Sequence, residues 1–227
     1  MHTRSAGPLF NEVGAARYEN AFIGGPHGQL ASLEWILSTL SSSSITGANC
    51  LDIGSGSGRP VCSTLAAAGH RVLGVDVSEA MVAFASEHVP LATFTRADIR
   101  DFKVEENQKY DVVTSYFGLI AEISQQEILE TLKKIGHEML KPGGIFVWAT
   151  VPVDVNLEEI MWMGKPVVVS NLAKDAAVEA VRDVAGLQIV NVVEEKFKPE
   201  KAVEAGICAE EDVWVEDHLY IWARKSA

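Results

Sequence analysis

The sequence predicts an α/β fold, a doubly wound and mostly parallel sheet of seven strands with helices on both faces. Apolar runs of the β type alternate along the chain with helical patterns, which is typical of such a sheet. The expected strands lie near residues 49–53, 71–76, 91–95, 110–115, 145–150, 187–197 and 218–224. The expected helices lie near residues 58–68, 78–88, 124–139 and 171–185. A chain of 227 residues is long enough for one such domain with an appended segment.

Helical spacing also predicts an amphipathic helix before the first strand. Its apolar positions are Leu30, Leu33, Ile36 or Leu37, and Leu40. The helix near 124–139 begins with a capping box, Ser124 and Glu127, and a Lys-Pro-Gly-Gly turn is expected to end it. We therefore expect a helical cap over residues 1–48 and a core over 49–227, with a lid inserted near 151–170.

The stretch LDIGSGSGRP, residues 51–60, predicts a loop that binds a ligand. Gly54, Gly56 and Gly58 allow a sharp turn and leave no Cβ between the backbone and a ligand. The loop leads into a helix, whose N-terminal end carries partial positive charge. A dinucleotide G-x-G-x-x-G motif would need glycine where Arg59 or Val61 stands, so the register disfavours NAD.

The next strand, residues 70–76, is apolar without polar alternation and ends in Asp76. An α/β nucleoside site places a carboxylate about 20 residues beyond its glycine loop, where it binds the ribose hydroxyls. Asp76 has that spacing. The alternative is that Asp76 only begins the turn before Ser78, the N-cap of the next helix.

These motifs, with three more, make the chain resemble the class I S-adenosylmethionine-dependent methyltransferases. The matching stretches are LDIGSGSG (51–58), GVDVSEAMV (74–82), RADIRDF (96–102), YDVVTSYFGLI (110–120) and LKPGG (140–144). They come in the order and at the spacing of that family. The resemblance implies a Rossmann-like sheet whose last strands form an edge with one antiparallel member. It also implies S-adenosyl-L-methionine as the cofactor.

Carried over position by position, the resemblance implies a set of cofactor-binding residues. The methionine part would lie against Asp52, Gly54, Ser55, Gly56 and Gly58; the ribose against Asp76 and Val77; the adenine against Asp98 and Ile99; and the sulfonium against Tyr116 and Phe117. Tyr18 resembles a tyrosine with which related enzymes close over the cofactor. The alternatives are a helix cap for Asp98 and core packing for Tyr116 and Tyr18.

Two segments outside the motifs, residues 1–40 and 151–170, are expected to form the acceptor pocket. The candidate substrate-binding residues are Trp148, Met161, Trp162 and Met163. The last three are contiguous and cannot all face inward from one side of a helix. At least one should therefore point into a pocket or toward a partner, with ordinary lid packing as the alternative.

Methyl transfer requires alignment of the acceptor with the donor, and a base only where the acceptor must lose a proton. His27 and Glu122 are candidate bases, although either residue can be structural. The other histidines (His70, His88, His137 and His218) are expected at the surface. Three cysteines without ligand spacing predict no metal site.

The composition limits the classes of partner. A net charge of −12 disfavours DNA or RNA as the substrate. No N-P-P-Y motif follows the fourth strand, which disfavours methylation of an amide or of the adenine amino group. No Pro-Cys motif stands there either, which disfavours methylation of cytosine at C5. The apolar runs are too short to cross a membrane, and the N-terminus has no signal core, so we expect a cytoplasmic protein. We expect a small-molecule acceptor and a monomer or homodimer.

Three functions stay open at this point. The leading hypothesis is a methyltransferase acting on a small, partly apolar metabolite through an O, N, S or C atom. The second is an enzyme that uses the bound cofactor for other chemistry, such as a cyclisation. The third is a non-catalytic subunit that binds the cofactor, which the intact glycine loop disfavours.

Overall fold

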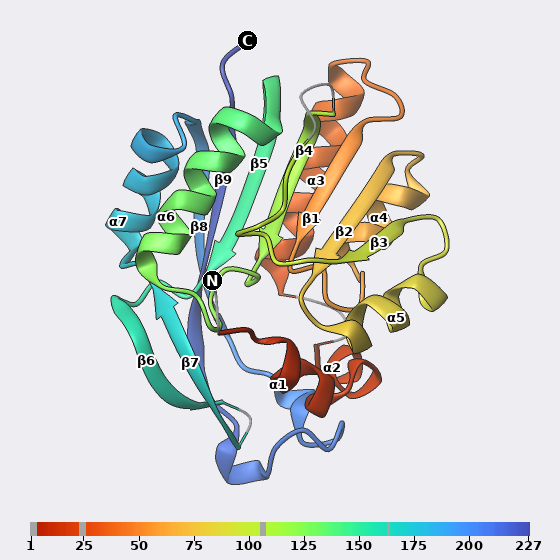
Figure 1. Cartoon of the computed structure of the whole chain (residues 1–227). Coiled ribbons are helices and arrows are strands. Elements are labelled where there is room, and N and C mark those ends of the chain that lie inside the picture. Colours follow the sequence, from red (N-terminus) through yellow and green to blue (C-terminus); the bar gives the residue numbers. More distant parts are fainter. Residues whose placement is uncertain (1–3, 23–25, 105–107, 163) are drawn as a thin grey trace.

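The computed structural model describes residues 4–22, 26–104, 108–162 and 164–227. Its centre is a seven-stranded sheet with the strand order β3-β2-β1-β4-β5-β9-β8 (Figure 1). The strands are β1 (Asn49–Ile53), β2 (Arg71–Asp76), β3 (Thr93–Arg96), β4 (Tyr110–Tyr116), β5 (Leu140–Thr150), β8 (Gln188–Phe197) and β9 (Glu216–Arg224). β9 runs antiparallel to both of its neighbours, β5 and β8, and the other four strand pairs of this sheet are parallel. The predicted sheet and its antiparallel edge are confirmed.

Helices cover both faces of the sheet, as predicted. The helices are α1 (Gly7–Val13), α2 (Ala15–Phe22), α3 (His27–Ser42), α4 (Val61–Ala67), α5 (Glu79–His88), α6 (Gln125–Lys134) and α7 (Lys174–Glu179). A π-helical turn follows α6 and another follows α7. The capping box of α6 is present: Glu127 N–H donates to the Ser124 side chain, and Ser124 N–H donates to the Glu127 carboxylate.

Alternate residues of the central strands build two separate cores, one on each face of the sheet. Leu51, Val113 and Phe146 pack with residues of α6 and α7. Cys50 and Val112 pack with residues of α3 and α4 on the opposite face. Apolar residues therefore point both ways from β1 and β4, which is why the sequence of these strands lacks a polar alternation.

The segment near 151–170, where the sequence predicted a lid insertion, contains no helix among its described residues. It forms an antiparallel hairpin of β6 (Val155–Trp162) and β7 (Lys165–Asn171), a second sheet of two strands. Met161 and Trp162 therefore alternate between the two sides of a strand, and the argument from helix faces was wrong for them. Successive side chains of each strand point to opposite sides of the hairpin.

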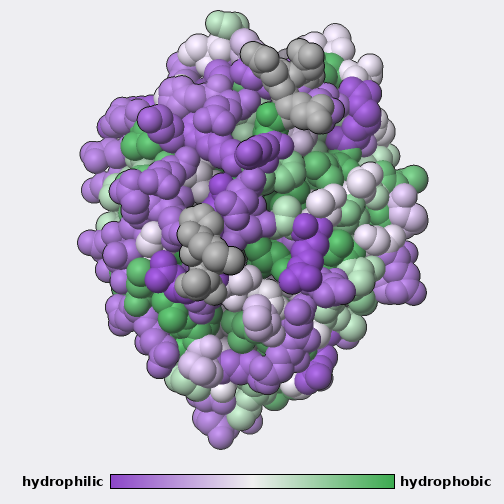
Figure 2. Space-filling view, in the orientation of Figure 1, coloured by the Kyte–Doolittle hydropathy of each residue, from purple (hydrophilic) through white to green (hydrophobic). Residues whose placement is uncertain are grey.

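Several segments gather at the carboxyl ends of β1, β2 and β4. Figure 1 shows α1, α2, the β6–β7 hairpin and the connection between β8 and β9 beside this edge. The face seen in Figure 2 carries polar residues with smaller apolar areas among them. Among the described helices, none combines the length and apolarity of a membrane span.

Candidate functional site

The glycine loop connects β1 to α4 through residues in left-handed conformations. The φ angles are +69° at Gly54, +52° at Gly56 and +78° at Gly58, values that L side chains rarely adopt. A Cβ on Gly54 would lie 2.5 Å from Cα of Gly118, so the loop and the end of β4 touch through bare backbone. The backbone N–H of Gly54 donates to Val75 O at 2.8 Å, which fixes the loop to β2.

Asp76, at the end of β2, faces the loop. Its Oδ2 accepts from Gly56 N–H at 2.9 Å, and its Oδ1 accepts from Ser78 N–H at 2.8 Å. Burial raises the pKa of Asp76, while these backbone donors act in the opposite direction. Each carboxylate oxygen has a second lone pair that can accept a further hydrogen bond, as a ligand hydroxyl would offer.

Asp52 is a second buried acid, one residue before the end of β1. Thr114 Oγ1 donates to its Oδ1 at 2.7 Å, and Cys62 Sγ lies 3.3 Å from its Oδ2. Burial raises the pKa of Asp52 to about 7. A cationic group bound beside this carboxylate would stabilise its ionised form.

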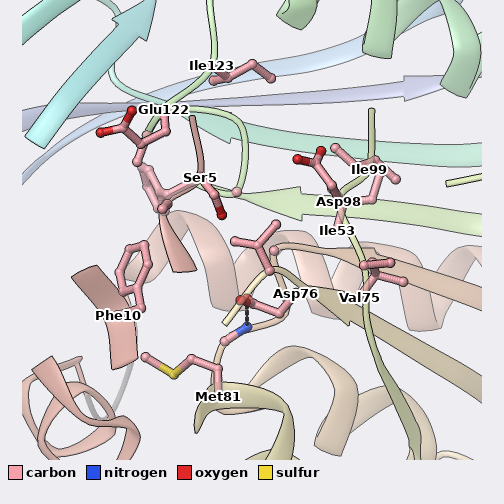
Figure 3. A pocket seen from close by; sticks show the side chains of 18 of the residues that line it. Ser5, Phe10, Ile53, Val75, Asp76, Met81, Asp98, Ile99, Glu122 and Ile123 are labelled. Carbon is pink, nitrogen blue, oxygen red and sulfur yellow. Dashed lines mark hydrogen bonds between the residues drawn. The ribbon is translucent and has the colours of Figure 1, made fainter. Parts of the chain in front are cut away.

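A first cavity of about 100 Å³ lies over Asp76. In Figure 3, Ser5 and Phe10 from the N-terminal segment lie on one side of it, and Val75, Asp98 and Ile99 lie on the other. Val77 and Met81 complete this part of the lining. The predicted ribose and adenine residues are thus brought together at one pocket.

The Asp98 carboxylate lines the first cavity and also takes part in an ion-pair network, so its role extends beyond the helix cap that was the alternative to adenine binding. It forms an ion pair with Arg100, whose Nη2 lies 2.6 Å from Oδ2. The Arg100 side chain is only 8% exposed, and it also contacts Glu127 at 3.0 Å and donates to Arg4 O at 2.7 Å. Arg100 therefore links one wall of the first cavity to the N-terminal segment.

A second and larger cavity of about 440 Å³ adjoins the first. The residues common to both linings are Phe10, Tyr18, Gly54, Gly56, Tyr116, Phe117 and Ala121. Asp52, Ser55 and the β6–β7 hairpin line the second cavity only. The hydroxyl of Ser55 is buried there without a partner among the described residues. The glycine loop therefore lies where the two cavities meet.

Four aromatic residues line both cavities at this meeting point: Phe10, Tyr18, Tyr116 and Phe117. Tyr116 is buried, and its hydroxyl lies 2.5 Å from Ser32 Oγ on α3. Burial raises the pKa of both Tyr116 and Tyr18, so both phenols stay neutral at physiological pH. Phe117 has a φ of +59°, and its N–H donates to Ala149 O. Tyr116 and Tyr18 thus face cavities and are more than core packing.

The structure places the predicted substrate residues in different surroundings. Trp162 lines the second cavity. Met161 is 68% exposed and lines neither cavity, and Trp148 is completely buried in the core below the site. The prediction is therefore wrong for Met161, on the outward side of β6, and for Trp148, on the core side of β5. Met163 lies outside the described residues.

The two candidate bases lie in different places, one at a cavity and one outside both cavities. Glu122 lines the first cavity with a φ of +59°, and its Oε1 accepts weakly from Val168 N–H at 3.4 Å. His27 is exposed at the first residue of α3 and lines neither cavity, which contradicts a role as a base.

Gly58, which the sequence placed in the cofactor site, also lines neither cavity. A Cβ at this position would lie 2.7 Å from the Phe94 ring, so the absence of a side chain allows the loop to pack against Phe94.

His218 is the residue that sequence reasoning missed. It was expected at the surface, but it is 3% exposed and lines the second cavity. Its Nε2 lies 2.8 Å from Glu216 Oε1, and its ring packs between Phe117 and Phe197 at 4.3 and 4.8 Å. Strand alternation could have indicated its burial, because His218 lies two residues before Tyr220 in β9 and therefore on the same face of the strand, and Tyr220 is buried.

Comparisons with known proteins agree with this geometry. Residues 50–144 match the family model described as a methyltransferase domain. A search of curated proteins gave no match. Several solved structures of low sequence identity share the fold.

Three of these structures cover nearly the same length as this chain. A putative S-adenosylmethionine-dependent methyltransferase from Listeria monocytogenes is 21% identical, with a TM-score of 0.65, over 88% of this chain and 97% of its own. A TehB-like SAM-dependent methyltransferase from Corynebacterium glutamicum is 19% identical, with a TM-score of 0.63, over 96% and 100%. Magnesium protoporphyrin IX methyltransferase from Synechocystis PCC 6803, with bound SAH, is 17% identical, with a TM-score of 0.65, over 97% and 98%.

Proposed function

We propose that this protein is a class I S-adenosylmethionine-dependent methyltransferase that methylates a small, partly apolar metabolite by in-line transfer. The match of residues 50–144 to a methyltransferase domain and the shared fold support the proposal. The observation that carries the proposal is the junction of two cavities at the glycine loop. One cavity has the polar groups that a nucleoside needs. The other has the volume and the apolar walls that suit a small organic molecule.

The residues at the first cavity and the loop fit S-adenosylmethionine. Asp76 would accept hydrogen bonds from the ribose hydroxyls, and Ile99 and Met81 offer apolar contact for the adenine. Asp98 lies at the same wall and would accept from the adenine amino group beside its Arg100 partner. Gly54 and Gly56 present bare backbone to the methionine part, and Asp52 offers a carboxylate for its ammonium group.

When bound, S-adenosylmethionine supplies a methyl group that its sulfonium activates toward displacement. The protein must align the acceptor with that group and exclude water, and alignment can contribute up to about 7–11 kcal/mol. Tyr18, Tyr116 and Phe117 stand at the junction of the cavities, where aromatic faces would stabilise a cationic centre. The N-terminal segment, through Phe10 and Tyr18, would cover the bound molecules.

Cell extracts incubated with the purified protein and methyl-labelled S-adenosylmethionine test this proposal directly. We expect the label in one small organic product, together with S-adenosylhomocysteine in equal amount. Asp76→Ala protein is the control and should transfer little label. Cofactor binding without S-adenosylhomocysteine formation in any extract would contradict the proposal and favour non-methylating chemistry or a binding subunit.

A further inference from the structure

The second cavity is bordered by a continuous series of aromatic rings, each in contact with the next. The series runs through Phe117, His218, Phe197, Phe22, Tyr18, Phe10, Trp162 and Trp214. The ring centroids in these contacts are 4.3–6.1 Å apart. All eight residues line the cavity, although they come from the N-terminal helices, the end of β4, the hairpin and β8–β9. Such a lining surrounds one bound molecule with aromatic side chains from several segments of the chain.

The charges around the same cavity are mainly negative. Glu216 and Glu158 line it. Arg59 is the cation among its described lining residues, and the Arg59 guanidinium is already paired with Glu19 at 3.3 Å. An anionic acceptor would therefore be repelled by these carboxylates, with few cationic groups in the lining to offset the repulsion. A cationic acceptor would be attracted.

Glu216 is held in place at the cavity by a buried partner. Its Oε1 lies 2.8 Å from His218 Nε2, and the other ring nitrogen of His218 lies 3.3 Å from the Tyr220 hydroxyl. The Glu216 side chain keeps 26% of its surface exposed, whereas that of His218 keeps 4%. The histidine thus fixes the carboxylate, and the carboxylate remains accessible from the cavity.

Tyr18 connects the glycine loop with the cavity that Glu216 lines, because Tyr18 lines both cavities. Burial is the main cause that raises the pKa of Tyr18, and the negative charges of Asp76 and Glu216 raise it further. A Cβ on Gly56 would lie 3.9 Å from the Tyr18 ring. Tyr18 therefore belongs to the junction of the two cavities, whereas Glu216 lines only the second cavity, on the acceptor side.

We infer that the second cavity binds its methyl acceptor as an organic cation, with a charged ammonium nitrogen beside Glu216 and among the aromatic rings. Another atom of the molecule accepts the methyl group, because an ammonium nitrogen has no lone pair to attack the methyl carbon. The inference rests on the proposed function for the role of acceptor site. A carboxylate supplies direct attraction, and aromatic faces within about 6 Å add cation–π attraction that a neutral ligand of the same shape does not gain. A cation–π contact alone contributes little in water, and both terms grow inside an apolar cavity.

Two probes of nearly the same shape and different charge test the inference: choline and 3,3-dimethyl-1-butanol. Both are titrated into the protein with and without S-adenosylhomocysteine. We expect wild-type protein to bind choline at least about tenfold more tightly than the neutral alcohol. Glu216→Gln should reduce that preference to less than about threefold. Glu159→Gln removes an exposed carboxylate of β6 that lines neither cavity, and should preserve the preference.

Equal binding of the two probes by wild-type protein, or no binding of either, would overturn the inference. A preference that survives Glu216→Gln in full would overturn the role of Glu216. The affinity for S-adenosylhomocysteine, measured in the same series, reports separately on the proposed function and on correct folding of each variant. Choline selectivity in protein that binds no S-adenosylhomocysteine would support the cation site while contradicting the proposed cofactor.

Discussion

Oδ2 of Asp76 accepts a hydrogen bond from the backbone N–H of Gly56 at 2.9 Å, which ties the end of β2 to the middle of the glycine loop. The same carboxylate accepts from Ser78 N–H, so it also orders the start of α5. Asp76 is 9% exposed. One side chain therefore shapes the loop before any ligand arrives and still faces the cavity where a ribose would lie.

Asp76→Ala should weaken binding of S-adenosylhomocysteine about 30- to 1000-fold, a loss of about 2–4 kcal/mol. Because two backbone donors lose their partner, the free energy of unfolding without ligand should also fall, by about 1–3 kcal/mol. Titration calorimetry and urea unfolding measure the two effects. Glu79→Ala is the control, since that carboxylate is 76% exposed and pairs only with the exposed Arg96 among the contacts described. Equal affinities of the two variants for S-adenosylhomocysteine would contradict the assignment of Asp76 to the cofactor site.

The raised pKa of Asp52 predicts a pH dependence of cofactor affinity. Its folded-state pKa is about 7, above the usual value of a carboxyl group, so the side chain is protonated at lower pH. A bound ammonium group needs the ionised form, so the affinity for S-adenosylhomocysteine should fall by up to about tenfold per unit as pH drops below 7. The stability of the free protein should change in the opposite sense, decreasing as pH rises from about 4 to 7.

Calorimetric titrations between pH 5.5 and 8 check this dependence, with Asp52→Asn as the matched variant. The variant should bind more weakly at pH 8 and show an affinity that changes little with pH. Wild-type affinity that is constant over this range would contradict the assignment of Asp52 to the ammonium group.

Deletion of residues 1–25 should abolish methyl transfer while leaving a folded core. Phe10 and Tyr18 line both cavities, so their loss opens the site to water. The core is expected to survive because α3 begins at His27 and β1 at Asn49. Circular dichroism and labelled methyl transfer measure the two properties. Full activity of the truncated protein would show that the segment is no cover, and loss of the folded core would show that its role is packing.

The elements of the sheet could be predicted because each strand that carries a motif is a short apolar run beside a glycine loop or an acid. The β6–β7 hairpin could not, because Met161, Trp162 and their neighbours lack the clean alternation of a half-buried strand. Met161 is exposed and Trp162 faces a cavity, a difference that only the register of the hairpin decides.

His218 and Trp148 show a second limit of sequence reasoning. His218 lies in a strand next to exposed acids, and its burial depends on Phe117 and Phe197, which come from distant parts of the chain. Trp148 belongs to a strand that is buried on both faces. Trp148 packs in one core, and its neighbours Val147 and Ala149 pack in the core on the opposite face of the sheet. Long-range packing decides both positions.

Thermal unfolding with added ligands tests the central claim most directly. At a ligand concentration 100 times Kd, S-adenosylhomocysteine should stabilise the native state by about 2.7 kcal/mol. For a chain of this size the melting temperature should rise by about 5–10 °C, and NAD should leave it unchanged. A shift with NAD and none with S-adenosylhomocysteine or S-adenosylmethionine would contradict the account.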